Sequence, residues 1–365
     1  MSRSPDPIEA VSQRLERFSQ DQVTIWSDAG AEAAGFAAAA ASALTGGKRL
    51  RARFCLAGWQ AIAELRSPHP TPTEDAVAAA AALEVFHAAA LVHDDLIDNS
   101  DTRRGRPSAH RALEAQHAAS EWTGDAAEFG RSSAILLGDL LVAWSDDLLE
   151  EGLREAAQAA HAAQARGVYA LMRREVTVGQ FLDIAEEAAF RSSPASEHAE
   201  RALRVASLKS ARYSVQHPLL LGAALAGADA AQTAALSAFG HPLGLAFQLR
   251  DDILGVFGDS AVTGKPSGDD LREGKRTVLI AYALEGMPAG AARTFDELLG
   301  DPTLDEAQIA ALQRTIRETG ALDRVEELIA RYADEADRAL RGAPLGTSAV
   351  GALRDLAREA TARSA

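Results

Sequence analysis

The sequence is poor in cysteine and in aromatic residues. It holds one cysteine, Cys55, so an internal disulfide framework is excluded and the cytoplasm, a reducing compartment, is the expected location. Aromatic residues make up only 5% of the chain, and alternating runs of β-branched residues are absent. No linker rich in proline, glycine or serine separates two halves. These absences disfavour a sheet-rich or disulfide-dependent fold.

What the chain has instead is alanine-rich apolar sequence over most of its 365 residues, 47% of which are hydrophobic. Alanine is the strongest helix former, and this much apolar sequence is ample for a large core. We predict an all-α fold in a single domain over residues 1–365, with about the first ten residues as a candidate disordered start.

The charge balance restricts the partners. A formal net charge of −15 argues against binding nucleic acid through the general surface, so anionic substrates would need a local basic cluster. The start, MSRSPDPIEA, has no apolar stretch of the signal-peptide kind. The most apolar run, Ala76 to Val92, contains Glu84 and His87, so we predict a buried core helix and no stable membrane insertion.

Helix-breaking residues divide the chain into expected elements. Residues 8–44 are predicted to be one helix, residues 115–131 a polar connection, and residues 258–275 a loop rich in glycine and charge. The other expected helices span about 48–65, 74–98, 132–150, 154–187, 199–208, 209–225 and 231–257, with four or five more between 276 and 365.

The stretch from Leu83 to Pro107 carries the clearest chemical signal. Asp94 and Asp98 are one helical turn apart and therefore point the same way, with Asp95 beside them. Like charges this close favour a wet surface or a bound cation, and Mg²⁺ takes one or two protein carboxylates beside substrate phosphates. Arg103 and Arg104 supply the forked donors that suit phosphate. The pattern predicts a metal–diphosphate site with an apolar wall.

A second acidic stretch, FQLRDDILG at 247–255, also ends an apolar helix with adjacent aspartates, Asp251 and Asp252. One such pair is most often a solvated helix end. Two pairs, each on an apolar helix and each followed by basic residues, favour carboxylates that bind Mg²⁺ on both sides of one diphosphate.

The basic residues and one histidine fit the same interpretation. Lys48 and Arg51 follow two glycines at a helix start, where free N–H groups favour anions. Lys265 and Lys275 lie in a loop where a lid over phosphates would be placed. His87 is either a core residue or a substrate ligand, because it shares the face of Asp94 two turns earlier; His93 is interpreted as structural.

Several short motifs, in their order along the chain, resemble those of the trans-isoprenyl diphosphate synthase, or polyprenyl synthetase, family. They are GGKRLR (46–51), HDDLID and RRGRP (93–107), GD (138–139), GQFLD (179–183), Lys209-Ser210, FQLRDDILG and GKPSGDDLREGK (264–275). The resemblance covers roughly residues 40 to 280. It implies an isoprenoid synthase-type helical bundle around a central cavity, usually a homodimer, in which the two aspartate-rich motifs bind Mg²⁺.

The resemblance also implies roles for individual residues. Asp94, Asp98 and Asp251 would be metal ligands, with Asp95 and Asp252 assisting. Arg103, Lys209 and Lys265 would hold the allylic diphosphate, and Lys275 would help to close the lid. Isopentenyl diphosphate would be bound by Lys48, Arg51, His87 and Arg104. Ser210 and Gln248 would lie near the developing allylic cation.

The implied reaction condenses isopentenyl diphosphate with dimethylallyl, geranyl or farnesyl diphosphate by ionisation, attack on the cation and loss of a proton. In the family, a bulky residue just before the first aspartate motif stops chain growth. Here Ala89 and Ala90 stand one turn before the aspartates. Phe86, a further turn away, is the next candidate for the floor, the bulky residue that ends the product tunnel. We therefore expect geranylgeranyl diphosphate, with farnesyl or longer polyprenyl products as alternatives.

The sequence departs from the family pattern at two positions: Gly255 stands where many relatives have a third aspartate, and Ser210 where threonine is common. Asp259 is a candidate replacement for the missing carboxylate. A terpene cyclase would not need GGKRLR, and an HD-type phosphohydrolase leaves residues 247–255 without a role. The alternative from another class is a non-catalytic partner subunit with the same fold.

Overall fold

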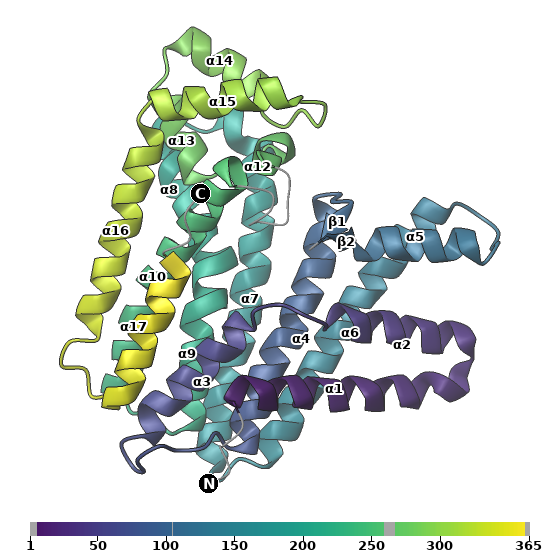
Figure 1. Ribbon diagram of the computed structural model, residues 1–365, viewed down its shortest axis with the longest axis vertical. Helices are drawn as coiled ribbons and strands as arrows, with labels where there is room; N and C mark the ends of the chain where they lie inside the picture. Colours follow the sequence, from purple (N-terminus) through teal and green to yellow (C-terminus); the bar gives the residue numbers. More distant parts are fainter. Residues whose placement is uncertain (1–5, 104, 259–266, 362–365) are drawn as a thin grey trace. The chain divides into compact units, whose positions relative to one another are not determined.

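The computed structural model describes residues 6–103, 105–258 and 267–361. Helices make up almost all of this part of the chain, which confirms the expected all-α class (Figure 1). The chain divides into two compact units. The first contains the residues up to Ala165 together with Leu221–Gly227, and the second contains Arg166–Leu220 and Ala228–Ala365. The expected single domain stays a prediction, and each unit is described by itself below.

The first unit is centred on one long apolar helix, α4. Ala76 and the residues from Ala78 to Leu83 are at most 1% exposed, so this part of α4 is surrounded on every side. Helix α6 packs closely against α4 at Gly152, because this residue has no side chain. A Cβ at Gly152 would lie only 2.6 Å from the Cβ of Ala78. The elements of the unit are α1 (Pro7–Trp26), η1 (Ser27–Ala29), α2 (Ala31–Ala43), α3 (Leu50–Ala63), α4 (Glu74–Ile97), β1 (Thr102–Arg103), β2 (Arg106–Pro107), α5 (Ala109–Ala119) and α6 (Ala126–Arg154).

Helix α4 is long and apolar enough to cross a membrane, but 78% of its most apolar stretch of 18 residues is buried inside the protein. The core helix of a protein that does not enter a membrane can have the same length and composition. The burial agrees with its interpretation as a core helix.

Two expected boundaries in this unit are wrong. Residues 8–44 are two helices rather than one, because Gly30 has φ +105°, a left-handed backbone that ends the short turn η1. Residues 115–131 are not an open connection: α5 continues to Ala119 and α6 begins at Ala126. The two helices close on each other because Gly130 of α6 leaves room for the backbone carbonyl of His110.

The short turn between α5 and α6 is held by an aromatic cluster. The His117 ring centroid lies 5.9 Å from that of Trp122 and 5.0 Å from that of Phe129. Its Nε2 lies 3.3 Å from the carbonyl oxygen of Thr123. These contacts give the glycine-containing stretch after Ala119 a structural role.

The second unit is built around α7 and α10, two long helices that carry the remaining motifs. Between residues 276 and 361, the structure has five helices, in agreement with the expected four or five. The elements after α6 are α7 (Ala159–Ala189), η2 (Phe190–Ser192), η3 (Ala195–Glu197), α8 (His198–Val205), η4 (Ala206–Gln216), α9 (His217–Leu225), α10 (Ala230–Phe257), α12 (Asp269–Glu273), α13 (Val278–Glu285), α14 (Ala289–Leu298), α15 (Glu306–Glu318), α16 (Ala321–Ala339) and α17 (Thr347–Thr361). The start of α7, up to Ala165, and the end of α9, from Leu221, belong to the first unit.

The segment η4 is a π-helix of 11 residues where an ordinary α-helix was expected. Long π-helical segments are rare and occur mostly at functional sites. This one contains Lys209 and Ser210, and it packs on α7 at Gly179. A Cβ at Gly179 would lie 2.4 Å from the backbone nitrogen of Lys209.

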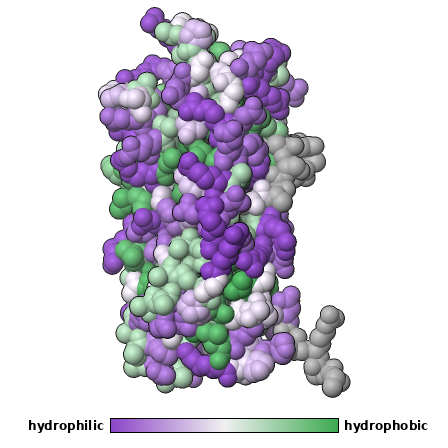
Figure 2. Space-filling model, turned by 90° about the vertical axis from the view of Figure 1, so that its left-hand side faces the viewer, coloured by the Kyte–Doolittle hydropathy of each residue, from purple (hydrophilic) through white to green (hydrophobic). Residues whose placement is uncertain are grey.

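The exterior is mixed in hydropathy. On the face shown in Figure 2, hydrophilic side chains predominate and hydrophobic ones form separate patches. Cys55 is fully buried, and burial raises the pKa of its thiol, so it is an inert core residue.

Candidate active site

Helix α4 delivers the first carboxylates at its C-terminal end. Asp94 and Asp98 are partly exposed, whereas Asp95 is buried, because the helical period turns it toward the interior. The N–H of Asp98 donates to the carbonyl of Asp94 over 2.8 Å, so the two residues are held one helical turn apart. Asp94 and Asp98, which the sequence predicted to share one face of the helix, are therefore both accessible on that face.

The β1–β2 hairpin, which the sequence analysis did not predict, brings an arginine back to these aspartates. Thr102 pairs with Pro107, and Arg103 pairs with Arg106. The Nε of Arg103 donates to Asp95 over 2.7 Å, and its guanidinium lies 3.6 Å from a carboxylate oxygen of Asp94. Asp95 thus orients Arg103 beside the exposed pair. Arg104 lies outside the described residues.

The GD motif supports α4 from α6. Gly138 has no side chain where the His93 ring passes, and a Cβ there would lie 2.1 Å from His93 Nε2. That nitrogen lies 3.2 Å from the carbonyl oxygen of Ile135 and 3.6 Å from a carboxylate oxygen of Asp139. His93 therefore ties the helix next to Asp94 to α6, in agreement with its interpretation as structural.

The basic turn before α3 is strongly bent. Gly46, Gly47 and Arg49 all have positive φ, which explains the two consecutive glycines. Lys48 is exposed and Arg51 is half-buried at the start of the helix. Arg49 points inward, and its guanidinium donates to the carbonyl of Leu44 over 2.8 Å. His87, on α4, is half-buried.

In the second unit, α7 and η4 place a lysine against an aspartate. Lys209 Nζ lies 2.5 Å from a carboxylate oxygen of Asp183, and both side chains are about one-fifth exposed. The sequence analysis quoted GQFLD as a motif but gave Asp183 no role. The salt bridge fixes the Lys209 ammonium at a partly exposed position, where a diphosphate could compete for it.

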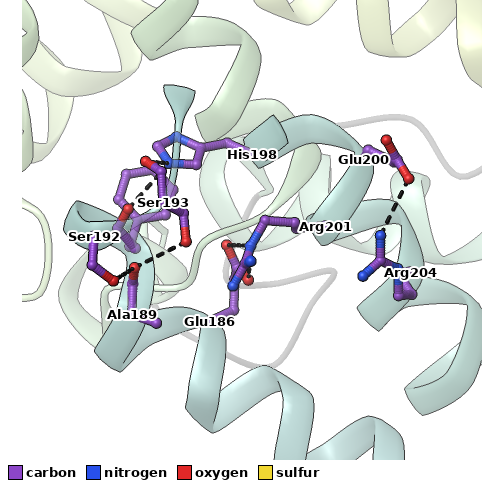
Figure 3. A network of polar contacts seen from close by, with 9 residues as sticks. Glu186, Ala189, Ser192, Ser193, His198, Glu200, Arg201 and Arg204 are labelled. Atoms are coloured by element: carbon purple, nitrogen blue, oxygen red, sulfur yellow. Dashed lines mark hydrogen bonds and ion pairs between the residues drawn. The ribbon is translucent and has the colours of Figure 1, made fainter. Parts of the chain in front are cut away.

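The C-terminal end of α7 is anchored to α8 by a network of polar contacts (Figure 3). The Nε of Arg201 donates to both carboxylate oxygens of the buried Glu186, at 3.0 and 2.7 Å. His198 Nε2 lies 3.1 Å from the carbonyl oxygen of Phe190, and its ring stacks on that residue at 3.8 Å. Since Glu186 is one turn beyond Asp183, the network holds the register of α7 against η4.

Helix α10 carries the second acidic pair in two different environments. Asp251 is partly exposed, whereas Asp252 is buried and accepts a hydrogen bond from the Gln248 amide over 2.7 Å. Burial raises the pKa of Asp252 to about 8, and the bond from Gln248 only partly opposes this. The intervening Arg250 turns away, and its guanidinium lies 2.5 Å from a carboxylate oxygen of Glu326 on α16.

A carboxylate from α12 fills the space beside Gly255. A Cβ at Gly255 would lie 1.9 Å from a carboxylate oxygen of Asp270. Because residues 251 and 255 are one turn apart, Asp270 stands on the face of α10 that also carries Asp251. Lys275 Nζ lies 2.6 Å from Glu273 and 3.8 Å from Asp270. Asp259 and Lys265 lie outside the described residues.

The donor chemistry of these side chains fits Mg²⁺. Each unit presents partly exposed carboxylates, the oxygen ligands that this ion prefers. Across the parts of the chain that the structure describes, no three histidine, cysteine or acidic side chains converge to hold an ion alone.

The residues that are expected to limit the length of the product lie where the solvent exposure of α4 ends. Ala90 is half-buried, Ala89 is fully buried, and Phe86 is 7% exposed. Toward the N-terminus from Phe86, Val85 and Leu83 are not exposed at all. The accessible stripe of α4 therefore runs back from Asp94 as far as His87, and the buried Phe86 lies next to its end.

Comparison with known proteins identifies the class. The helical fold is that of isoprenoid-forming prenyltransferases, since the chain superimposes on geranylgeranyl pyrophosphate synthase of Corynebacterium glutamicum, solved with isoprenyl diphosphate and magnesium. The TM-score is 0.90 and the sequence identity 40%, with 98% of each chain covered. The family model of polyprenyl synthetase matches residues 35–316. The chain belongs to the polyprenyl synthetase family, as the motif resemblance indicated.

Curated relatives span several product lengths. The chain is 34% identical to heptaprenyl diphosphate synthase component 2 of Geobacillus stearothermophilus, covering 96% of this chain and 94% of the relative. It is 31% identical to geranylgeranyl diphosphate synthase of Methanosarcina mazei, covering 80% and 78%. The comparisons thus establish a prenyltransferase and leave its product length open.

Proposed function

We propose that the protein condenses isopentenyl diphosphate with an allylic diphosphate, and that its product is geranylgeranyl diphosphate. The observation that carries the proposal is the end of α4: Asp94 and Asp98 share one partly exposed face, and Arg103 is held beside them. Two carboxylates on one helical turn, with an arginine from the following hairpin 3.6 Å from one of them, suit a metal-bound diphosphate.

Bound Mg²⁺ would supply Lewis-acid stabilisation of the diphosphate leaving group, with Asp94, Asp98 and Asp251 as its protein ligands. Asp95 acts indirectly, because it orients Arg103 toward the departing oxygens. Asp252 is buried behind Asp251 and accepts a hydrogen bond from the half-buried Gln248, so it orients the Gln248 amide.

The cationic side chains divide between the two substrates. Arg103, Lys209 and Lys265 hold the allylic diphosphate, and Lys209 exchanges its contact with Asp183 for a phosphate oxygen. Lys48, Arg51, His87 and Arg104 hold isopentenyl diphosphate, which brings its double bond close to the allylic carbon. Ser210 and Gln248 face the developing cation, and Lys275 closes the loop over it. The proton that is lost leaves with the diphosphate.

The product assignment rests on the wall of α4. Ala89 and Ala90 leave room beyond the aspartates, and Phe86 stands two turns before Asp94, where the exposure of the helix ends. A helix rises about 1.5 Å per residue, so the stripe from Asp94 to Phe86 is roughly 12 Å long. The likeness to geranylgeranyl pyrophosphate synthase supports this length over the heptaprenyl alternative.

A homodimer in the cytoplasm is part of the proposal. Large hydrophobic side chains are exposed on two helices: Ile135 and Leu136 on α6, and Leu171, Val178, Phe181 and Ile184 on α7. A second copy of the chain would cover such surfaces. The single cysteine supports a reducing compartment.

A second candidate function is that of a subunit in a two-component synthase. It is favoured by the likeness to a protein named component 2 of heptaprenyl diphosphate synthase. The test incubates the purified protein alone with Mg²⁺, isopentenyl diphosphate and, separately, dimethylallyl, geranyl or farnesyl diphosphate. Twenty-carbon products support the first proposal. No condensation by the folded protein rejects it and favours the subunit.

A further inference from the structure

The buried carboxylate of Glu84 has no place in the reaction described above. It lies in the middle of α4, nearly three turns before Asp94, and its side chain is only 5% exposed. A buried glutamate is costly unless its oxygens are bonded. Its partners belong to another helix, and they lie at the start of α3.

Glu84 caps α3 from outside the helix. Its Oε1 accepts the backbone N–H of Ala52 over 3.0 Å, and Ala52 is the third residue of α3. The residue that would normally cap this helix is Arg49, which is left-handed and makes no side-chain cap. Glu84 therefore satisfies an N–H that would otherwise be unpaired in the interior.

Arg49 links this cap to the preceding turn. Its guanidinium lies 3.8 Å from Glu84 Oε2 and donates to the carbonyl of Leu44, where α2 ends. The turn between these two anchor points contains two left-handed glycines, Gly46 and Gly47. Its shape depends on both anchors.

We propose that Glu84 is a positioning residue for isopentenyl diphosphate, because it fixes the turn that presents Lys48 and Arg51. This inference rests on the proposed role of those two side chains. Without the cap, the first turn of α3 frays, and the two cations lose the fixed spacing that a diphosphate requires.

The test measures isopentenyl diphosphate affinity by calorimetry, so it does not depend on turnover. Glu84→Ala is expected to bind roughly fivefold more weakly, the scale of a lost helix cap. Glu84→Gln keeps an acceptor for the Ala52 N–H and should stay within about twofold of the wild type. Val85→Ala, the neighbouring buried position on α4, is the control for general loss of packing and should leave the affinity unchanged.

Two further measurements guard the interpretation. Hydrogen exchange at the Ala52 amide should accelerate in Glu84→Ala and not in Val85→Ala. If Glu84→Ala does not fold, Arg49→Met removes the second anchor and should weaken binding several-fold.

Affinity in Glu84→Ala equal to that of the wild type, or an equal loss in Val85→Ala, overturns the inference. Failure of the wild type itself to bind isopentenyl diphosphate overturns the proposed function instead.

Discussion

Gly179 on α7 offers a sharp test of how the helices position Lys209. In Gly179→Ala, the new Cβ would lie 2.4 Å from the backbone nitrogen of Lys209 and 2.7 Å from the carbonyl carbon of Leu208. These are backbone atoms of η4, so no side-chain rotation can relieve the overlap. Overpacking of this kind costs about 1–3 kcal/mol, whereas alanine in place of glycine gains about 1 kcal/mol of helix propensity.

The same helix provides a matched control. Gly167 has no heavy atom within 4 Å of its absent Cβ, so Gly167→Ala should gain stability from propensity alone. We expect the two variants to differ by about 1–3 kcal/mol in the free energy of unfolding, with Gly179→Ala the less stable.

A second readout connects the overlap to function. Displacement of η4 moves Lys209 away from Asp183, so KM for the allylic diphosphate should rise only in Gly179→Ala. Urea unfolding and initial rates decide the matter. The reasoning is refuted if Gly179→Ala is as stable as Gly167→Ala and keeps the wild-type KM.

Two further predictions concern the product and the metal. Phe86→Ala should shift the products toward longer chains, because it removes the side chain where the exposed stripe of α4 ends. Chromatography of the dephosphorylated products checks this, and an unchanged distribution would show that Phe86 is not the floor. Gly255→Ala should displace the Asp270 carboxylate, which lies within 1.9 Å of the new Cβ, while the melting temperature changes little because only the end of a side chain must move. The Mg²⁺ dependence of pyrophosphate binding should then weaken several-fold, and an unchanged dependence would exclude a role for Asp270 at the metal.

Local sequence signals predicted α4 well. Its expected span, residues 74–98, differs from the observed Glu74–Ile97 by one residue, because an apolar run between a breaker-rich loop and three aspartates has clear ends. The exposed pair Asp94 and Asp98 and the buried Asp95 follow from the same helical period. Patterns that repeat within a few residues are visible without a structure.

Contacts between segments distant in the sequence were not visible. Nothing near Glu84 in the sequence indicates that it bonds Ala52, and nothing near Gly255 indicates that Asp270 fills its space. Asp183 was quoted within a motif, but its pairing with Lys209 depends on the π-helical course of η4. The close approach of Gly179 could have been suspected only from an unexplained glycine inside a helix.

The break at Gly30 shows the limit of composition alone. The absence of a strong breaker and the alanine-rich stretch after residue 30 favour one continuous helix, yet the left-handed φ of Gly30 interrupts it. The absent side chain allows this conformation but does not require it. The choice is made by packing, which propensity does not describe.

The measurement that tests the account most directly compares Asp94→Ala with Asp101→Ala in the condensation of isopentenyl diphosphate with the allylic primer that the wild type uses. Asp101 is an exposed aspartate just beyond α4 that pairs with Arg111, so it controls for loss of charge near the site. The account predicts that Asp94→Ala loses about a hundredfold or more in rate, since metal stabilisation of developing charge contributes several kcal/mol, and that Asp101→Ala retains activity. Equal rates in the two folded variants would contradict the assignment of α4 as the metal–diphosphate site.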